Sequence, residues 1–430
     1  MDYKVVEIKS SSAERMVILL RRTDGLPPYW PNLFALTHFR NASAATNTVR
    51  RVIKTLAIIY TWAQRRGIDI DHHLSREGFL TESQVEDLAV TLRCHADELE
   101  NNDGDQRRTQ PPKTLEQVRR TKTAPGRVLI SANEAGVRMR YASRYFRWHG
   151  ERRLSAMLRT DSEAAQVLQT AIHRACAILE RTTPNFKSQN DLEARHGLAP
   201  DERALLVDIL RPNQPSNPFA GAFVQVRNDI LINTMLATGA RAGELLQMKV
   251  EDLDFARTRI RIHRSPDDPD DPRVRAVHTK TRARDVPVSE GLMDSLREFV
   301  RNHWNRIPPR HRQHGYLWTT QSGRPLAQAS LNYIFQVIRK SEPRLPGNFC
   351  AHVMRHTWNE VFSEAIDRGG ANQRVTQEQE ARIRERLMGW TTGSKMAAVY
   401  NRRYDRRKAD EIAEEMATSI VRNAKKAIEP

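Results

Sequence analysis

The chain has 430 residues, 39% of them hydrophobic, and its 69 lysines and arginines against 52 acidic residues give a formal net charge of +17. This length exceeds what one hydrophobic core usually organises, so we expect two domains, and the apolar fraction excludes a chain that is disordered by composition. The basic excess indicates a polyanionic partner, with nucleic acid as the leading candidate. A basic membrane-surface protein is the alternative, but we find no apolar run long enough to span a bilayer and no signal peptide.

Two short strands are predicted at the start of the chain, at residues 3–9 and 15–20, ahead of a Pro-rich connection at 24–31. Apolar residues then recur every three or four positions within 41–67, which is typical of an amphipathic helix, and Gly67 is a natural terminator. Cations cluster elsewhere around this helix, where they can meet phosphate. They are candidate DNA contacts: Arg50, Arg51 and Lys54.

A second helix is predicted at 81–100, followed by a polar, basic and Pro-containing segment at 101–127. We interpret that segment as a loop or linker on the DNA-facing side, with a disordered surface insertion as the equally weighted alternative. Residues 133–159 interleave arginines with aromatic residues at helical spacing. We assign the aromatic residues to packing, whereas exposed arginines on a helix can bind phosphate oxygens in a fork geometry. The candidates are Arg138, Arg144 and Arg147.

A break at 184–200 separates this helical region from a second region with a different sequence pattern, and we place the domain boundary close to residue 190. The second region carries several short motifs, spaced apart along the chain, whose order matters. Arg241 and Glu244 follow a Thr-Gly turn between two helices within 233–255. Strands are predicted at residues 259–263, 273–280 and 285–289. Lys280 would then lie at the tip of a β-hairpin.

The later signals are a H-x-x-R-H group with His352, Arg355 and His356, then Trp390 after a glycine, then Tyr400 with Tyr404 one helical turn further on. Each signal alone is weak, because an Arg three residues before a Glu is an ordinary helical ion pair and a hairpin lysine is usually a solvated edge residue. The ordered set is far more specific.

This set resembles the tyrosine recombinase family, also called the phage integrases, over roughly residues 198–410. TGARAGELLQM and HVMRHT match the family closely. The resemblance implies a mainly α fold with a small antiparallel β-sheet in the catalytic domain (α+β), arranged as a two-domain C-shaped DNA clamp. Residues 1–190 would form a mostly helical core-DNA-binding domain, with its short β segments at 1–22, and residues 191–430 would form the catalytic domain with a C-terminal helix.

The resemblance also implies a division of roles. Arg241 and Arg355 would stabilise the charge that develops on a reacting phosphodiester. Tyr400 would attack the phosphorus, Lys280 would protonate the leaving 5′ oxygen and His352 would assist proton transfer. Trp390 would donate its indole N–H to phosphate. Glu244 would orient neighbouring groups, and Arg282 and Arg284 would add DNA contacts.

The 3′-phosphotyrosine product keeps the phosphodiester bond energy, so the resemblance implies no cofactor, neither ATP nor a metal. A metal site at His352 and His356 would need further ligands, and neither an HExxH nor a CxxC motif is present. The cluster of His303, His311 and His314 lies in a Pro-broken stretch that we interpret as a basic surface loop. The cysteines are three in number and widely spaced, which favours buried thiols in a reducing cytoplasm: Cys94, Cys176 and Cys350.

The expected partner is double-stranded DNA with inverted-repeat core sites, on which the chain would form dimers and a tetrameric synapse, with accessory DNA-binding factors left open. We expect no membrane partner and a cytoplasmic, nucleoid-associated protein of a bacterium.

An apolar stripe near the C-terminus consists of Ala409, Ile412, Ala413, Met416 and Ile420. This stripe could dock on its own domain or on a neighbouring protomer. The alternatives are a type IB topoisomerase, which shares the chemistry, and a DNA-binding regulator with a lapsed active site. The biological task, whether integration, excision, resolution or transposition, stays open.

Overall fold

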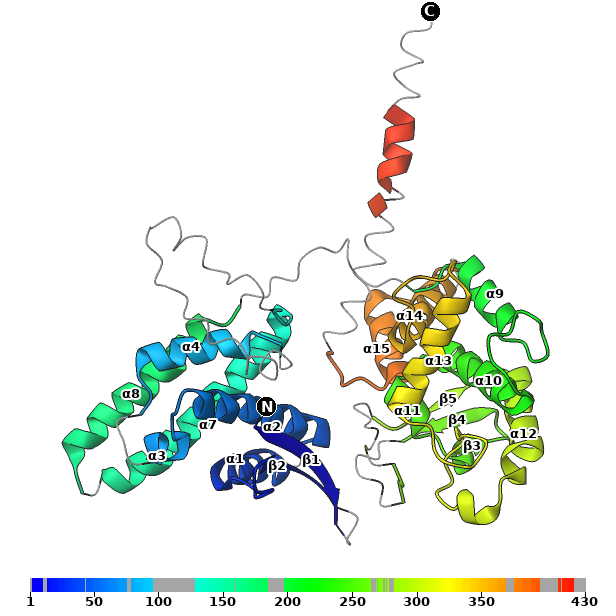
Figure 1. Cartoon of the computed structure of the whole chain (residues 1–430). Coiled ribbons are helices and arrows are strands. Elements are labelled where there is room, and N and C mark those ends of the chain that lie inside the picture. Colours follow the sequence, from blue (N-terminus) through cyan, green and yellow to red (C-terminus); the bar gives the residue numbers. More distant parts are fainter. Residues whose placement is uncertain are drawn as a thin grey trace, which may run out of the picture. The chain divides into compact units, whose positions relative to one another are not determined.

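The computed structural model describes most of the chain and divides it into two compact units, Met1–Asp191 and Leu192–Pro430 (Figure 1). The described residues are 2–10, 14–42, 44–75, 79–95, 128–158, 160–184, 197–263, 268, 270–273, 275, 277, 282–368, 375–394, 409–410 and 412–420. Within them the protein is mainly helical with two small antiparallel sheets, as the sequence predicts. None of the helices in these ranges is both long and apolar enough to cross a membrane.

The first unit begins with a β-hairpin and continues as a helical domain. Its elements are β1 (Tyr3–Lys9), β2 (Arg15–Arg21), α1 (Tyr29–Ala35), the π-helix η1 (Leu36–Arg40), α2 (Thr46–Arg65), α3 (Ile70–Ser75), α4 (Glu82–Leu92), α7 (Ala132–Met157) and α8 (Ser162–Arg181). The strands pair antiparallel from Tyr3 opposite Arg21 to Lys9 opposite Arg15, which confirms the two predicted strands. The end of the predicted Pro-rich connection is helical instead, because α1 starts at Tyr29.

Aromatic side chains on α7 form the centre of this unit. Tyr145 and Phe146 are fully buried, and Trp148 is nearly so, which confirms that these residues pack and do not stack on bases. The Tyr145 and Tyr60 hydroxyls lie 2.7 Å apart and link α7 to α2. Cys94 and Cys176 are buried as expected, whereas Cys350 in the second unit is half-buried.

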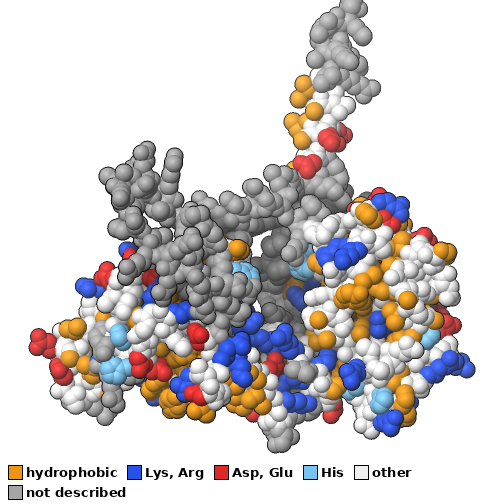
Figure 2. Space-filling model, in the orientation of Figure 1, with side chains coloured by type: hydrophobic (Ala, Val, Ile, Leu, Met, Phe, Trp, Pro, Cys, Tyr) orange, Lys and Arg blue, Asp and Glu red, His pale blue; other side chains and the backbone are white. Residues whose placement is uncertain are grey.

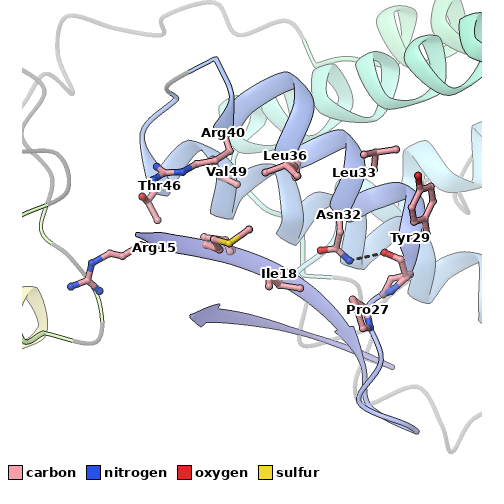
Figure 3. Close-up of a pocket in the computed structure, with 14 residues that line it drawn as sticks. Arg15, Ile18, Pro27, Tyr29, Asn32, Leu33, Leu36, Arg40, Thr46 and Val49 are labelled. Carbon is pink, nitrogen blue, oxygen red and sulfur yellow. Dashed lines mark hydrogen bonds between the residues drawn. The ribbon is translucent and has the colours of Figure 1, made fainter. Parts of the chain in front are cut away.

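An apolar groove of about 340 Å³ lies between β2, α1 and the start of α2 (Figure 3). Asn32 fixes one wall of the groove, since its side-chain amide donates to the Leu19 carbonyl at 3.0 Å and accepts from the Leu19 amide at 2.8 Å. The groove is thus built from β2, α1 and the start of α2, which lie close together in the sequence.

The second unit combines a three-stranded antiparallel sheet, in the order β3-β4-β5, with helices around it. Its elements are α9 (Pro200–Ile209), α10 (Ala222–Thr238), α11 (Ala242–Leu246), η3 (Val250–Asp252), β3 (Leu253–Asp254), β4 (Arg259–Ile262), β5 (Arg284–Pro287), α12 (Glu290–Asn302), η4 (Trp304–Arg306), η5 (Pro309–His311), α13 (Gln328–Ser341), α14 (Ala351–Arg368) and α15 (Gln377–Met388). Its own hydrophobic core gathers residues from α9 to α14.

The strand predicted at 273–280 is wrong for the residues of that stretch that the structure describes, namely Arg273, Arg275 and Val277. Arg273 explains the difference, because its guanidinium is buried and donates to the carbonyls of Leu246 and Leu326 at 2.9 and 3.0 Å. A side chain held inward in this way anchors an irregular segment. Lys280, in the connection between β4 and β5, lies outside the described residues.

Candidate active site

The site begins at the turn between α10 and α11. Helix α10 ends at Thr238, and Gly239 follows in the left-handed conformation with φ of 58°, donating its amide to the Met235 carbonyl at 2.9 Å. Glycine adopts this conformation without steric cost. A Cβ at this position would also lie only 2.8 Å from Met388 Cε and from Trp358 Cγ. The turn therefore needs glycine both for its left-handed backbone and for the space beside it. The turn places Arg241 at the start of α11.

Glu244 is a buried carboxylate that holds two arginines. Its Oε2 accepts from the Arg241 amide at 3.1 Å and from Arg284 Nη2 at 2.7 Å, and its Oε1 lies 3.3 Å from Arg241 Nη1. The side chains of Glu244 and Arg284 are 0% and 5% exposed, while that of Arg241 is 31% exposed. A buried charge requires such partners. Glu244 thus fixes the backbone and the head group of Arg241, which keeps a solvent-facing surface.

Arg355 lies on α14 and is only 2% exposed. Its Nη1 donates to the Gly239 carbonyl at 2.7 Å and its Nη2 to the Met388 carbonyl at 3.3 Å. The same guanidinium lies over the Trp390 ring, 5.5 Å from its centroid. One arginine therefore joins the turn after α10, the end of α15 and the tryptophan.

The end of α15 repeats the geometry of the first turn. Gly389 is left-handed with φ of 65°, and the Trp390 amide then donates to the Glu385 carbonyl at 2.9 Å. The Arg282 amide donates to the Gly389 carbonyl at 2.9 Å, so the residues leading into β5 are held beside Trp390. Two glycine turns from separate parts of the sequence thus meet at one place.

His352 is exposed on the first turn of α14, one turn before the buried His356. The two imidazole centroids lie 4.5 Å apart in an edge-to-face arrangement. Both histidines belong to the helix that carries Arg355. His352 lies at the exposed N-terminal end of this helix, and His356 lies inside the protein. Over the described ranges, no three His, Cys, Asp or Glu side chains are grouped so that they could hold a metal ion.

The structure therefore brings together five of the predicted site residues: Arg241, Glu244, Arg284, Arg355 and Trp390. Lys280, Tyr400 and Tyr404 lie outside the described residues. The sequence groups Arg284 with the DNA contacts, but the structure places its guanidinium inside the unit on Glu244. Arg282 has an exposed side chain and stays a candidate DNA contact.

The candidate DNA contacts of the first unit differ in their surroundings. Arg138 is mostly buried and donates to the Cys94 carbonyl at 2.9 Å, so it joins α7 to the end of α4. Arg50 is paired with Glu7, and Arg51 is paired with Glu134. Arg147 lies 3.5 Å from a Glu180 carboxylate oxygen. The side chains of four of these candidates are exposed: Arg51, Lys54, Arg144 and Arg147. Figure 2 shows Lys and Arg side chains on the visible faces of both units, interspersed with acidic and apolar ones.

Two residues that sequence reasoning does not select contribute to the site. Gly239 accepts the bond from Arg355, and Trp358 donates its indole Nε1 to the Ala237 carbonyl at 3.0 Å. The Thr-Gly turn is visible in the sequence as a helix break. Nothing in the spacing identifies Trp358, because an aromatic residue on a helix most often belongs to the core.

One comparison with known proteins falls within the second unit. Residues 213–407 match the model of the phage integrase family. Tyrosine recombinase XerC of Pediococcus pentosaceus is 24% identical over 156 residues, which are 36% of this chain and 45% of that protein. XerC of Staphylococcus haemolyticus is 22% identical over 152 residues, 35% of this chain and 44% of that protein. The chain thus spans a little under half the length of these relatives.

Two complexes with DNA are among the solved structures to which this chain is similar. The Tn1549 transposon integrase with circular intermediate DNA is 17% identical, with a TM-score of 0.38 over 75% of this chain and 95% of that one. The XerH recombinase with palindromic difH substrate is 14% identical, with a TM-score of 0.41 over 89% of this chain and 94% of that one. The family match, residues 213–407, contains all the predicted catalytic positions.

Proposed function

We propose that this chain, which belongs to the phage integrase family of tyrosine recombinases through residues 213–407, is a site-specific DNA recombinase. The observation that carries the proposal is the meeting of Arg241, Arg355 and Trp390 at two glycine turns. Two fixed guanidiniums, one of which lies over an indole, are suited to a phosphodiester, because its transition state carries more negative charge than its ground state. The Glu244 carboxylate holds Arg241, and two backbone carbonyls hold Arg355, before substrate arrives.

The proposed reaction is a transesterification at phosphorus. The phenol oxygen of Tyr400 attacks, the bond to the 5′ oxygen breaks, and Lys280 gives that oxygen a proton. The DNA is left with a free 5′ hydroxyl and a 3′-phosphotyrosine bond to the protein. Attack by the 5′ hydroxyl of another strand reverses the step and releases Tyr400. His352, exposed at the N-terminal start of α14, assists proton transfer, and Trp390 donates to the phosphate.

The partners we propose are DNA and further copies of this chain. The net charge of +17 supports a polyanionic ligand. A C-shaped clamp of the two units would enclose a duplex with inverted-repeat core sites. Dimers on each site would pair into a tetramer that exchanges strands through a Holliday junction, with or without accessory factors. The setting proposed is the cytoplasm and nucleoid of a bacterium.

An exposed apolar stripe on the C-terminal helix supports the proposal that copies of the chain assemble. Its described residues, 409–410 and 412–420, are all exposed. Ile412, Met416 and Ile420 recur every four residues and are 55%, 58% and 62% exposed. An apolar stripe of this kind gains free energy when it is buried on a partner. We propose that it docks on a neighbouring protomer in the synapse.

Covalent capture on DNA of random sequence tests the proposed function. The full chain is incubated with a library of nicked random-sequence duplexes, and DNA that stays attached to protein after denaturation is recovered and sequenced. A recombinase would enrich an inverted-repeat core and would yield a Tyr400 peptide carrying a nucleotide. Enrichment by binding without any covalent adduct would favour a regulator with a lapsed site. Adducts without sequence preference, with relaxation of supercoils by the monomer, would favour a topoisomerase.

A further inference from the structure

Trp358 lies on α14, three residues after Arg355, and reaches back to the end of α10. Its indole Nε1 donates to the Ala237 carbonyl at 3.0 Å. This carbonyl belongs to the last turn of α10, where carbonyl groups have no partner within the helix. The indole supplies that partner. It therefore anchors the chain two residues before the Gly239 turn and four residues before Arg241.

The same ring fills the space beside Gly239. A Cβ on Gly239 would lie 2.8 Å from Trp358 Cγ and 3.0 Å from Trp358 Cδ2, so the glycine backbone packs directly on the indole. The Gly239 carbonyl is the group that accepts from Arg355 Nη1 at 2.7 Å. The peptide that binds one arginine is thus held in position by the tryptophan, and the chain then continues directly to the other arginine.

Trp358 is itself held from α15. Its ring stacks on Phe362 with 5.4 Å between centroids and an interplanar angle of 12°. The Arg384 guanidinium covers Phe362 at 4.9 Å from its centroid and donates to Ser363 Oγ at 2.8 Å. A layered contact therefore runs from α15 through Phe362 to Trp358 and ends at the turn.

We propose that Trp358 is a positioning residue for strand cleavage, which holds the turn between α10 and α11 so that Arg241 and Arg355 address one phosphate. This inference rests on the recombinase function proposed above. Trp358 acts through the two arginines and does not itself touch the phosphate. Loss of its hold shifts the guanidiniums relative to each other, and displacements of about 1 Å near a reacting group cost up to about 100-fold in rate.

Hydrogen exchange tests the structural half of the inference without any DNA. Trp358→Phe keeps a ring beside Gly239 and Phe362 but removes the donor to Ala237. Exchange in the peptide spanning 236–241 should rise by about tenfold, the equivalent of one lost hydrogen bond. Trp304→Phe is the matched control, since Trp304 Nε1 donates to the Tyr316 carbonyl at 2.9 Å and holds neither arginine. Unchanged exchange in 236–241 for Trp358→Phe would overturn the inference whatever the protein does to DNA.

Cleavage kinetics test the functional half, with the nicked duplex recovered by covalent capture. Trp358→Phe should slow single-turnover adduct formation about tenfold while the dissociation constant for DNA changes less than about twofold. Trp304→Phe should change neither. The loss should shrink on a duplex with a methylphosphonate at the cleaved position, because that group lacks the charge that the two guanidiniums stabilise. A purely structural defect would slow both substrates equally.

The outcomes separate this inference from the recombinase proposal. No adduct with the unchanged protein would contradict the recombinase function, and the exchange measurement would then decide alone whether Trp358 holds the turn. An active unchanged protein with equal rates for Trp358→Phe would refute the positioning role and leave the recombinase function intact. Equal loss on phosphodiester and methylphosphonate would also refute it.

Discussion

Arg241 and Arg355 have different surroundings despite the same proposed role. Arg241 keeps about a third of its side chain exposed and is braced by Glu244, whereas Arg355 is buried and donates to two backbone carbonyls. Removal of Arg355 therefore leaves buried carbonyls without their partner, in addition to removing a charge from the phosphate site. Arg241 is the cleaner probe of phosphate stabilisation.

Arg241→Ala should retain DNA binding and lose cleavage. Many other basic residues supply the salt-dependent affinity for the DNA backbone, so the dissociation constant should change little. The rate of adduct formation should fall about 100- to 1,000-fold, the usual effect of removing one donor from a developing charge. Gel shift and single-turnover assays on one duplex measure the two quantities. Equal losses of binding and cleavage would contradict the assignment, and Arg257→Ala, at an exposed arginine, is the control.

Gly239→Ala should disrupt the site through the backbone. A left-handed alanine costs about 1–2 kcal/mol, and its Cβ would also press on Met388 and Trp358 at 2.8 Å. We expect the free energy of unfolding of the second unit to fall by about 2 kcal/mol or more, with loss of cleavage. Gly291→Ala is the matched control, because its Cβ meets nothing within 4 Å and helix α12 should gain about 0.5–1 kcal/mol. Denaturation curves that are equal for both variants would contradict this account.

His149 makes the first unit sensitive to acid. Burial in the aromatic cluster with Trp30 and Tyr145 lowers its pKa to about 4. The unfolded chain binds a proton near pH 6.5, while the folded protein stays neutral until about pH 4. Stability is therefore fully present above pH 6.5 and falls by about 1.4 kcal/mol per pH unit down to about pH 4.

The contribution of His149 can be separated by comparing two variants. His149→Phe should flatten the dependence of the free energy of unfolding on pH between about 4 and 6.5. His173→Gln, at an exposed position on α8, should leave the dependence as it is. The measurement is denaturant unfolding of the first unit at a series of pH values. A slope that survives in His149→Phe would assign the acid sensitivity to other groups.

The sequence indicates the type of each chemical group better than its partner. Arg241, Glu244, Arg355 and Trp390 follow from an ordered motif, and the structure brings them together. Arg284 resembles a DNA contact in the sequence because a basic residue near a hairpin is usually solvated. Its actual partner, Glu244, lies 40 residues away in the chain, and no local pattern predicts a contact of that separation.

At the scale of elements, periodic segments are predictable and irregular ones are not. The strands β1 and β2 and the long helices α2 and α7 follow from alternation and three-to-four-residue spacing. The strand predicted at 273–280 is wrong at the described residues 273, 275 and 277, because alternating basic and apolar residues there resemble a half-buried strand. Burial of the Arg273 guanidinium on two backbone carbonyls depends on the tertiary structure and leaves no periodic signal.

The C-terminal helix carries a prediction about assembly. Truncation after Arg407 removes the exposed stripe of Ile412, Met416 and Ile420 and leaves in place the described contacts of Arg241 with Glu244 and of Arg355 with Gly239 and Met388. Binding to a half-site should persist, while pairing of two occupied sites should be lost. Sedimentation of the DNA complexes distinguishes dimers from tetramers. Undiminished recombination by the truncated protein would refute docking on a neighbouring protomer.

At the scale of the whole molecule, each of the two units has its own hydrophobic core and a different part in the function that we propose. The first unit contributes exposed cations on a packed aromatic centre, and the second contributes the arginine site. The net charge of +17 gives affinity for any nucleic acid, whereas the glycine turns, Glu244 and Trp358 arrange a few cations for one reaction. The general charge is evident from composition alone. The arrangement requires the structure.

The central claim is that this arrangement serves a covalent attack by Tyr400, and trapping on a nicked duplex tests it most directly. The nick lets the short fragment that carries the new 5′ hydroxyl diffuse away after cleavage. The strand cannot then be rejoined, so the protein stays attached to the DNA. The unchanged protein and Tyr404→Phe should each give an adduct that survives denaturing electrophoresis, and Tyr400→Phe should give none. An adduct formed by Tyr400→Phe, or a trapped peptide that maps to Tyr404, would contradict the claim.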